Sequence, residues 1–313
     1  MSSDDSMQDR VENALVIRVT GGDVWVRIGA TVVACSLRGR FRVKEKSLQV
    51  VAGDRVEVRR EPSGSVALEK VLPRASWLSR HADRGRGSRL IVANVERLFV
   101  VASLGEPPPH PEFLNRILAA AEWGHAPAVV VLNKTDMGGK GEVAAFRSVY
   151  EGAGYDVFET CAASGSGVDA LAALVGQGVY AFVGESGVGK SSLLNRLDPA
   201  LDLDVREVGE RTGRGRHTTA YSQLFPFRKG FLADTPGMQT FQFPGDDPDG
   251  VAECFPEIVR METRCRFDPC SHTHEPSCAV KAAVETGAID AARFASYVEI
   301  VRDLRERAAN KQW

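Results

Sequence analysis

The feature that most constrains this chain of 313 residues is the stretch GESGVGKS at 184–191. It has the pattern G-x-x-x-x-G-K-S, it follows the apolar run VYAFV, and it precedes the helical pattern SSLLNRL. A glycine-rich loop between a strand and a helix presents backbone N–H groups that bind phosphate. With both flanks correct, a chance glycine turn is the minor alternative. The stretch predicts an α/β fold built around a phosphate-binding loop.

Each position of this loop has an expected role. The glycines let the backbone approach the phosphates, Lys190 reaches the terminal phosphates, and the Ser191 hydroxyl holds Mg²⁺. The predicted nucleotide contacts in this stretch are Gly184, Glu185, Ser186, Gly187, Val188, Gly189, Lys190, Ser191 and Ser192.

A second element, DTPG at 234–237, ends the apolar run GFLA further along the chain. Asp234 is placed to hold Mg²⁺ through water, and the Gly237 N–H is placed to bond the terminal phosphate of a nucleoside triphosphate. DTPG alone is a weak signal, and its position after a phosphate loop makes it a strong one.

The stretch NKTD at 133–136 follows another apolar run, AVVVL. The Asp136 carboxylate can accept hydrogen bonds from the N1–H and the N2 amino group of guanine, an edge that adenine lacks. Asn133 and Lys134 are expected to brace the loop and cover the base. We therefore predict GTP rather than ATP as the nucleotide, and the alternative is an ordinary surface turn.

The stretch CAASGSG at 161–167 is a loose match to a loop whose backbone contacts guanine O6, and it adds Cys161 and Ala162 to the predicted contacts. The order along the chain is therefore base reader, base loop, phosphate loop and then DTPG. An ordinary GTPase has the phosphate loop first. Domain termini often lie close together and chains can be reopened at surface loops, so this order predicts a circularly permuted GTPase domain.

The residue after the DTPG glycine is Met238, where many GTPases have a glutamine that orients the attacking water. The glycine-rich, basic stretch RTGRGRHTTA at 211–220 offers a substitute. His217 is our predicted catalytic residue, as a water-orienting group or base, and the alternative is a solvated or phosphate-steering loop residue. Thr218 and Thr219 are predicted GTP contacts. We assign Thr219 to Mg²⁺, although the sequence leaves the choice between the two open.

Three cysteines and two histidines gather in CRFDPCSHTHEPSC at 265–278. The spacing C-x4-C-x-H-x5-C predicts a closed, structural zinc site, with free structural cysteines as the alternative. The predicted ligands are Cys265, Cys270, His272 and Cys278. His274, two residues after His272, is the competing ligand.

Short Val-rich runs separated by glycine turns fill residues 11–75 and predict a small antiparallel barrel, of the OB type or, almost equally, of the SH3-like type. From Arg38 to Arg89 there are fourteen Lys or Arg and six Asp or Glu. This local excess favours binding of RNA through its backbone or shape, with a solvated barrel surface as the alternative.

The divisions that we predict are a disordered leader at 1–10, the barrel at 11–75, a linker at 76–95, the GTPase domain at 96–245 and a zinc-binding helical domain at 246–313. The net charge is only −2, so nucleic-acid binding has no support from overall charge. No apolar run approaches the about 20 residues that span a bilayer, and the N-terminus lacks a signal-peptide core. We therefore expect a cytoplasmic protein, and we assume a monomer.

Four features occur together: a basic barrel, NKTD before GESGVGKS, GRGRHTT before DTPG, and C-x4-C-x-H-x5-C. This combination closely resembles the circularly permuted GTPases that depend on the small ribosomal subunit, the RsgA or YjeQ family. The resemblance covers about residues 12 to 305. Two departures are Glu96, where Asp is usual, and Cys161 in the loose guanine loop.

The resemblance implies an OB barrel, a permuted P-loop GTPase and a zinc-binding helical domain. It implies that the chain binds the small ribosomal subunit and its rRNA late in maturation, that the subunit stimulates hydrolysis of GTP to GDP and phosphate, and that hydrolysis accompanies release. It matches His217 to the family's catalytic histidine, and it matches the nucleotide and zinc residues named above to the family's own.

Two other functions stay open from the sequence: a GTP-dependent binding module for another RNA with slow hydrolysis, and a GTPase that delivers zinc. A closed Cys3His site argues against delivery. The permuted order also places Gly237 shortly before the zinc domain. We therefore expect that movement at Gly237 on hydrolysis tilts the zinc domain.

Overall fold

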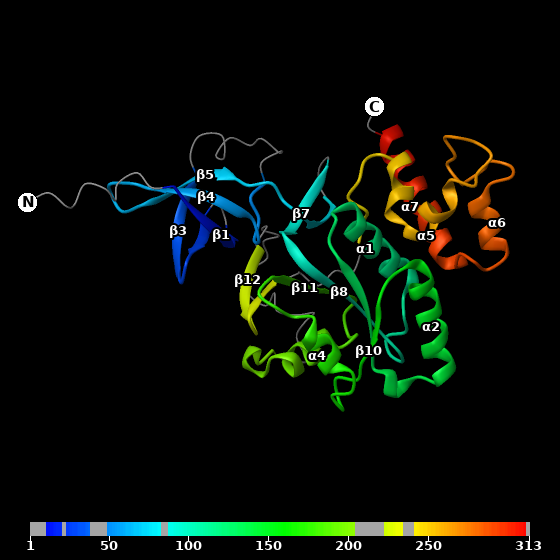
Figure 1. The fold of residues 1–313 in the computed structure, drawn as a ribbon, viewed down its shortest axis with the longest axis horizontal. Coiled ribbons are helices and arrows are strands. Elements are labelled where there is room, and N and C mark those ends of the chain that lie inside the picture. The colour runs from blue at the N-terminus through cyan, green and yellow to red at the C-terminus, as the bar shows by residue number, and fades with distance from the viewer. Residues whose placement is uncertain are drawn as a thin grey trace, which may run out of the picture.

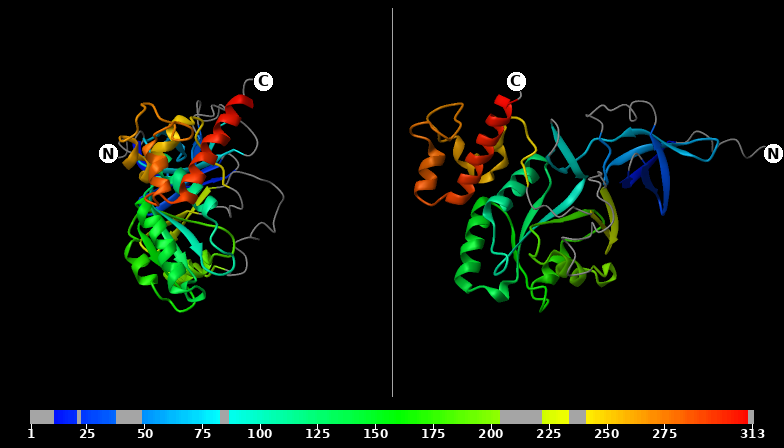
Figure 2. Two further views of the ribbon diagram at one scale, coloured as in Figure 1. Left: turned by 90° about the vertical axis from the view of Figure 1, so that its right-hand side faces the viewer. Right: turned by 180° about the vertical axis from the view of Figure 1, so that it is seen from behind.

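The computed structural model describes residues 11–20, 23–37, 49–82, 87–203, 222–233 and 241–310. These residues form a barrel of strands, an α/β core and a helical part, and Figure 1 shows the barrel and the helical part on either side of the core, which extends below them in this view. The view from behind in Figure 2 shows the same order, with the barrel and the helical part on opposite sides of the core. The core therefore contacts both of the other parts. Among the described residues, no helix has the length and apolar character needed to cross a membrane.

The barrel is closed and has five strands. They are β1 (Val11–Thr20), β2 (Asp23–Ile28), β3 (Thr31–Leu37), β4 (Arg55–Arg60) and β5 (Val66–Val71). The hydrogen-bonded order is β1-β2-β3-β5-β4, and antiparallel pairing of β1 with β4 closes the ring. Only β3 and β5 are parallel to each other among these neighbours. This is the arrangement of an OB barrel, so the OB prediction is confirmed over the SH3-like alternative.

The α/β core contains six strands of the main sheet. They are β8 (Val95–Ser103), β9 (Ala128–Asn133), β10 (Val157–Glu159), β11 (Val179–Val183), β12 (Ser222–Phe227) and β13 (Gly230–Ala233). Their order is β10-β9-β8-β11-β13-β12, and every neighbouring pair is parallel except β12 with β13. Parallel strands that are covered on both faces read as continuous apolar runs, and the VYAFV run, now β11, is buried at all five positions.

Helices cover the two faces of this sheet. They are α1 (Pro111–Trp123), α2 (Lys140–Ala153), α3 (Val168–Ala173) and α4 (Lys190–Leu197), with short 3-10 segments η2 (Thr135–Met137) and η3 (Pro199–Leu201). Successive residues of β8 point to opposite faces: Val100 packs with residues of α1, and Val101 packs with residues of α3 and α4. Because the strands are parallel, the loops after β8, β9, β10 and β11 meet at one edge of the sheet.

The segment that we predicted as a linker, 76–95, contains two strands that the sequence did not lead us to expect. β6 (Trp77–His81) and β7 (Ser88–Ala93) form an antiparallel two-stranded sheet. Leu78 and Val92 of these strands are fully buried in the same apolar cluster as the core strands. The charged residues around 83–86 hid this pattern, since they interrupt the alternation of apolar and polar positions.

The barrel joins the core along an edge strand. Strand β1 pairs with β12 at Arg18↔Gln223 and Val19↔Ser222, so that barrel and core strands form one continuous sheet. The Arg27 guanidinium lies 4.8 Å from the ring centroid of Phe231 in β13. Most of the barrel's apolar side chains, such as Val16 and Val26, nevertheless form a cluster of their own.

The helical part consists of η4 (Asp249–Cys254), α5 (Pro256–Glu262), α6 (Ala279–Glu285) and α7 (Ala291–Asn310). Asp290 is the N-cap of the last helix, because its Oδ1 accepts from the backbone N–H groups of Ala292 at 2.9 Å and Arg293 at 3.0 Å. Apolar side chains of all four elements share a cluster with Ala119 of α1. The helical part and the core therefore have a common interior.

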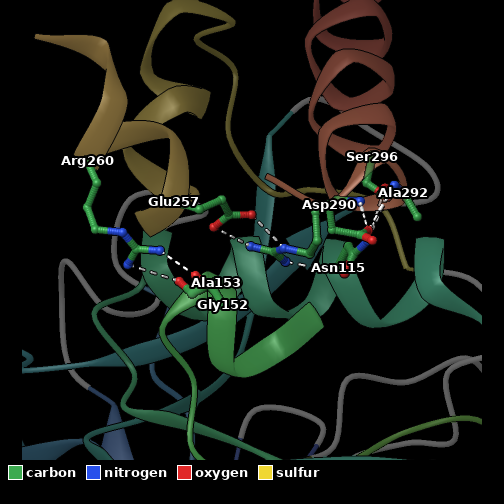
Figure 3. Close-up of polar contacts among 9 residues, drawn as sticks. Asn115, Gly152, Ala153, Glu257, Arg260, Asp290, Ala292 and Ser296 are labelled. Atoms are coloured by element: carbon green, nitrogen blue, oxygen red, sulfur yellow. Dashed lines mark hydrogen bonds and ion pairs between the residues drawn. The ribbon is translucent and has the colours of Figure 1, made fainter. Parts of the chain in front are cut away.

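A buried polar network lies at this boundary (Figure 3). Arg293 of α7, 1% exposed, donates from Nε to Glu257 Oε1 at 2.7 Å and from Nη2 to Oε2 at 3.1 Å. Its Nη1 donates to Asn115 Oδ1 at 3.3 Å, and Asn115 Nδ2 donates to Ser296 Oγ at 2.9 Å. Arg260 of α5 donates to the carbonyl of Gly152, near the end of α2, at 2.6 Å. These bonds fix α5 and α7 to the core helices.

Candidate functional site

The loop after β9 contains NKTD, and Asn133 is its buried member, at 1% exposed. Its Nδ2 donates to the carbonyl of Val188 in the GESGVGKS loop at 2.9 Å. Its Oδ1 accepts from the N–H of Ala162 at 3.1 Å and from Thr160 Oγ1 at 3.2 Å. One side chain therefore joins three loops that are far apart in the sequence: the NKTD loop, the CAASGSG loop and the phosphate loop.

The other NKTD residues surround this brace: Lys134 and Thr135 are half-buried, and Asp136 is exposed. Lys134 has a left-handed backbone with φ of 57°, and its Nζ donates to the Glu106 carbonyl at 2.5 Å. Thr135 Oγ1 donates to the Thr160 carbonyl at 3.1 Å. Asp136 is exposed in η2, so its carboxylate is open to a ligand.

The CAASGSG loop forms a tight turn. The Cys161 N–H donates to the Ser166 carbonyl at 3.0 Å, and the Gly165 N–H donates to the Cys161 carbonyl at 2.8 Å. The Cys161 side chain is buried, at 4% exposed, whereas Ala162 is half-buried. The Cys161 thiol therefore packs inside, and the backbone of the turn remains at the edge of the site.

The phosphate loop connects β11 to α4, as predicted from its flanks. Gly189 has φ of +93°, and a side-chain carbon there would lie 2.3 Å from Asn133 Nδ2. Glycine is required at this position for the Asn133 brace to form. Glycine is also required at Gly184, because an added carbon there would lie 2.3 Å from the Val101 carbonyl oxygen in β8.

Lys190, at the start of α4, is 8% exposed and donates from Nζ to the carbonyls of Gly184 at 2.7 Å and Glu185 at 2.5 Å. Burial lowers the pKa of its ammonium to about 8, and the charge of the Glu185 carboxylate acts in the opposite direction. The ammonium is therefore buried without full compensation. An anion bound in the phosphate loop would supply the missing negative charge.

Ser191 is 4% exposed, and its Oγ has no hydrogen-bond partner among the described residues. Buried polar groups are normally paired, so an orphaned hydroxyl needs an explanation. A Mg²⁺ ion held by this oxygen would satisfy it, and the residue fits the role predicted from the sequence. The other predicted magnesium ligands, Thr219 and Asp234, lie outside the described residues, as do His217, Thr218 and Gly237.

The four predicted zinc ligands come together. The ligand atoms of Cys265, Cys270, His272 and Cys278 all lie within 4.8 Å of one another. The Sγ atoms of Cys265 and Cys278 are 3.8 Å apart, and His272 Nδ1 is 3.6 Å from the first and 3.4 Å from the second. A tetrahedron with Zn–S of about 2.3 Å and Zn–N of about 2.0 Å has edges of about 3.5–3.8 Å. The geometry fits zinc.

His274, the competing ligand, is not part of this group. Its side chain is 77% exposed, and its Nδ1 lies 3.0 Å from Thr273 Oγ1. The loop that positions His272 is held from outside: Tyr297 of α7 donates to the Ser271 carbonyl at 2.7 Å, and Glu275 accepts from the Ser271 N–H at 2.7 Å. Such supporting bonds orient metal ligands.

The basic region is described only in part. Seven of its fourteen cations lie outside the described residues: Arg38, Arg40, Arg42, Lys44, Lys46, Arg84 and Arg86. Within the described barrel, Arg74 pairs with the buried Asp54 at 2.6 Å, and Arg59 pairs with Glu69 at 3.1 Å. These two cations serve the barrel itself, so the prediction of RNA binding rests mainly on the others.

The sequence model of the RsgA GTPase family matches residues 71–244 of this chain. The chain therefore belongs to the RsgA GTPase family.

Full-length relatives agree with this assignment. A "Small ribosomal subunit biogenesis GTPase RsgA" of Moorella thermoacetica is 40% identical over 94% of this chain and 98% of its own length. One of the same name from Gemmatimonas aurantiaca is 39% identical with the same coverage. YjeQ of Thermotoga maritima is similar in structure, with a TM-score of 0.74 and 30% identity over 94% of this chain and 99% of its own.

The permuted order of the motifs is shared with a solved structure. YloQ, described as a circularly permuted GTPase, has a TM-score of 0.71 and 26% identity, over 98% of this chain and 99% of its own. As an RsgA-family member, this chain is a GTPase with a permuted core between an N-terminal barrel and a C-terminal helical part that contains the Cys3His group.

Two groups at the RsgA-family site were missed from the sequence. The loop after β8, at 104–110, contacts the site through the Glu106 carbonyl and through His110 Nδ1, which lies 3.3 Å from Glu185 Oε1. Its place after a central parallel strand is the signal that could have found it. Arg196 of α4 donates to the carbonyls of Ala162 at 3.1 Å and Ala163 at 3.0 Å. No sequence pattern indicates that bond.

Proposed function

We propose that this chain is a GTPase that binds the small ribosomal subunit and assists its late maturation. The subunit stimulates hydrolysis of GTP to GDP and phosphate, and hydrolysis accompanies release. The observation that carries the GTPase part is the Asn133 brace, which joins the predicted base-reading loops to the phosphate loop through bonds of 2.9 and 3.1 Å. The names of relatives that match nearly the full chain support the partner.

Some of the predicted site residues bind the guanine base, and the others bind the phosphates. Asp136 reads the guanine edge, with Asn133 and Lys134 bracing its loop and the turn at Cys161 and Ala162 beside the base. Lys190 binds the terminal phosphates, because its buried ammonium gains a counter-charge there. Asp234, Gly237, Thr218 and Thr219 complete the phosphate side. His217 orients the attacking water, in place of the glutamine that Met238 replaces.

Two metal ions belong to this proposal. Mg²⁺ is held by Ser191, with Thr219 and Asp234, and its charge neutralises the phosphates. The orphaned Ser191 hydroxyl supports it. One structural Zn²⁺ is held by Cys265, Cys270, His272 and Cys278, and it orders a polar loop that has few apolar residues of its own.

The barrel and the zinc domain both contact rRNA in this proposal, and the chain acts as a monomer in the cytoplasm. The local excess of basic residues between Arg38 and Arg89 supports the barrel contact, because phosphate contacts by Lys and Arg provide most of the affinity for RNA backbone.

The test is GTP turnover by the full chain alone and with purified small subunits, large subunits or tRNA. We expect stimulation of about tenfold or more by small subunits only, and up to about 10³–10⁵-fold if the partner orders the stretch at 211–220 that contains His217. His217→Ala should lose the stimulation while GDP binding stays intact. Stimulation by tRNA alone would favour a GTP-dependent module for another RNA. Stimulation by none of the three would contradict the ribosomal proposal.

A further inference from the structure

Arg196 connects the helix that follows the phosphate loop, α4, to the CAASGSG loop that is predicted to contact the base. It lies in the last turn of α4, the helix that begins with Lys190 and Ser191. Its guanidinium donates from Nε to the Ala162 carbonyl at 3.1 Å and from Nη2 to the Ala163 carbonyl at 3.0 Å. The helix that starts at the phosphates therefore holds the turn that is predicted to contact the base.

These two bonds orient the peptide groups of that turn. In a trans peptide the C=O and N–H groups point in opposite directions. The bond at the Ala162 carbonyl therefore directs the Ala163 N–H away from α4. On the other side of the turn, the N–H of Ala162 is held by Asn133 Oδ1 at 3.1 Å. Successive peptide groups are thus fixed from two different elements.

The turn also has a glycine next to the guanidinium. Gly165 has φ of +86°, and a side-chain carbon added there would lie 3.6 Å from Arg196 Nη2. The guanidinium therefore lies beside a glycine whose backbone conformation other residues rarely adopt. A planar fork with several donors suits two neighbouring carbonyls, which a lysine ammonium on a flexible chain does not match as well.

Asn133 and Arg196 form a crossed pair of connections. Asn133 starts in the base-reading loop and bonds the Val188 carbonyl of the phosphate loop at 2.9 Å. Arg196 starts in the phosphate helix and bonds the base turn. If either connection is removed, the phosphate loop stays attached to β11, but the turn at 161–166 can shift relative to the phosphate loop.

We propose that Arg196 is a positioning residue for guanine recognition, which acts by holding the turn at 161–166 in register with the phosphate helix. The inference rests on the proposed function, because it requires that this turn contacts the base. It affects affinity for the guanine base and leaves the phosphate contacts unchanged. It therefore changes Kd and KM, and it does not change kcat.

The experiment compares Arg196→Ala with Arg228→Ala in the full chain. Arg228 is the matched control, because its Nη1 donates at 2.8 Å to the carbonyl of Leu197, at the end of the same helix, and it does not bond the base turn. Dissociation constants are measured for GDP and for ADP, with GTP turnover at saturation and the thermal midpoint of unfolding. Arg196→Lys is included as the conservative variant.

We expect Arg196→Ala to raise the Kd for GDP and the KM for GTP by about tenfold, which corresponds to about 1.4 kcal/mol, with kcat within about twofold. The Kd for ADP should not change, so the preference for GDP over ADP falls by the same factor. Arg196→Lys should recover part of the loss, and Arg228→Ala should leave the preference unchanged.

Two results would overturn the inference. One is an unchanged Kd for GDP, and the other is an equal loss for GDP and ADP, which would mean that α4 has merely been destabilised. If the wild-type chain itself binds GDP no better than ADP, the proposed guanine site fails as well, and the inference fails with it. Stimulation by small subunits is measured separately, so the ribosomal part of the proposed function is tested independently of Arg196.

Discussion

Two buried cations in this chain have opposite surroundings. Arg293, at the boundary of the core and the helical part, is 1% exposed and makes two hydrogen bonds to Glu257 and one to Asn115. Lys190, in the phosphate loop, is 8% exposed and donates to two backbone carbonyls, and it forms no ion pair within the described part of the chain. One charge is compensated by the fold, and the other is not.

The pKa shifts agree with this difference. Burial acts to lower the pKa of Arg293, but the Glu257 charge and hydrogen bonds raise it above its usual value. Burial lowers the pKa of Lys190 to about 8. Ser191, next to Lys190, also has a buried hydroxyl without a described partner. A ligand in the predicted phosphate loop would satisfy both the Lys190 ammonium and the Ser191 hydroxyl, whereas Arg293 already has Glu257 and Asn115 as partners.

The Cys3His group is a second site that a ligand would complete, and loss of the proposed zinc should have the largest effect. Structural zinc contributes about 10–16 kcal/mol in small zinc peptides. We expect Cys265→Ser to lose zinc and much of the helix signal of α5 to α7, measured by metal content and circular dichroism. His274→Ala is the control and should keep both, because His274 lies outside the group. Full helicity in a zinc-free protein would contradict this.

The Arg293 network should give the next largest effect. Arg293→Met leaves the Glu257 carboxylate buried and unpaired, so we expect the free energy of unfolding in urea to fall by about 3–5 kcal/mol. Adding Glu257→Leu should recover most of the loss, because the uncompensated charge is then gone. Arg302→Ala, which removes an exposed pair with Glu306, should cost less than about 1 kcal/mol. An equal loss of stability in Arg293→Met and Arg302→Ala would contradict the claim that the Arg293 charge is compensated by a buried partner.

The uncompensated Lys190 should make nucleotide binding depend on pH. The charged ammonium binds phosphate, so above pH 8 the affinity for GDP should fall by up to about tenfold per pH unit. The effect on the free protein has the opposite sign. The folded pKa lies below the usual value of 10.5, so this group adds stability as the pH rises from 8 toward 10.5. Calorimetric titration between pH 7 and 9.5 measures the first effect, and Lys190→Met should bind weakly with a flat profile.

The smallest expected effect concerns movement of the helical part, the predicted zinc domain. The sequence led us to expect that Gly237 tilts this domain on hydrolysis, but the Arg293 network and the Arg260 bond fix it to α1 and α2. We therefore expect labels at Ser148 and Glu285 to keep their separation between GDP and a GTP analogue, within the about 1–2 Å of a helix shift. A larger change would show that the buried network opens during the cycle.

Much of this arrangement could be predicted from local sequence. The strand–loop–helix context of GESGVGKS depends on a pattern of a few residues, and the small barrel depends on short Val-rich runs between glycine turns; the structure has both. The order of the motifs also predicted the permutation, because parallel strands bring their loops to one edge whatever the order of the chain.

The rest depends on contacts between distant residues. Arg196 bonds carbonyls more than thirty positions away, and Asn115 bonds residues of α7 almost at the other end of the chain. Nothing in the neighbouring sequence of either residue distinguishes it from an ordinary helix residue. The strands at 77–81 and 88–93 were missed for a related reason, since their burial comes from packing against the core.

The most direct test of the guanine site exchanges its base specificity. Asp136 is exposed at the edge of the braced loop, where its carboxylate can accept from guanine. Asp136→Asn replaces an acceptor by an amide that can donate, which suits xanthine, because xanthine has an oxygen in place of the guanine amino group. We predict that this variant loses affinity for GDP by about 100-fold or more and gains affinity for xanthosine diphosphate. Unchanged affinity for both nucleotides would contradict the claim that NKTD reads the base in this permuted chain.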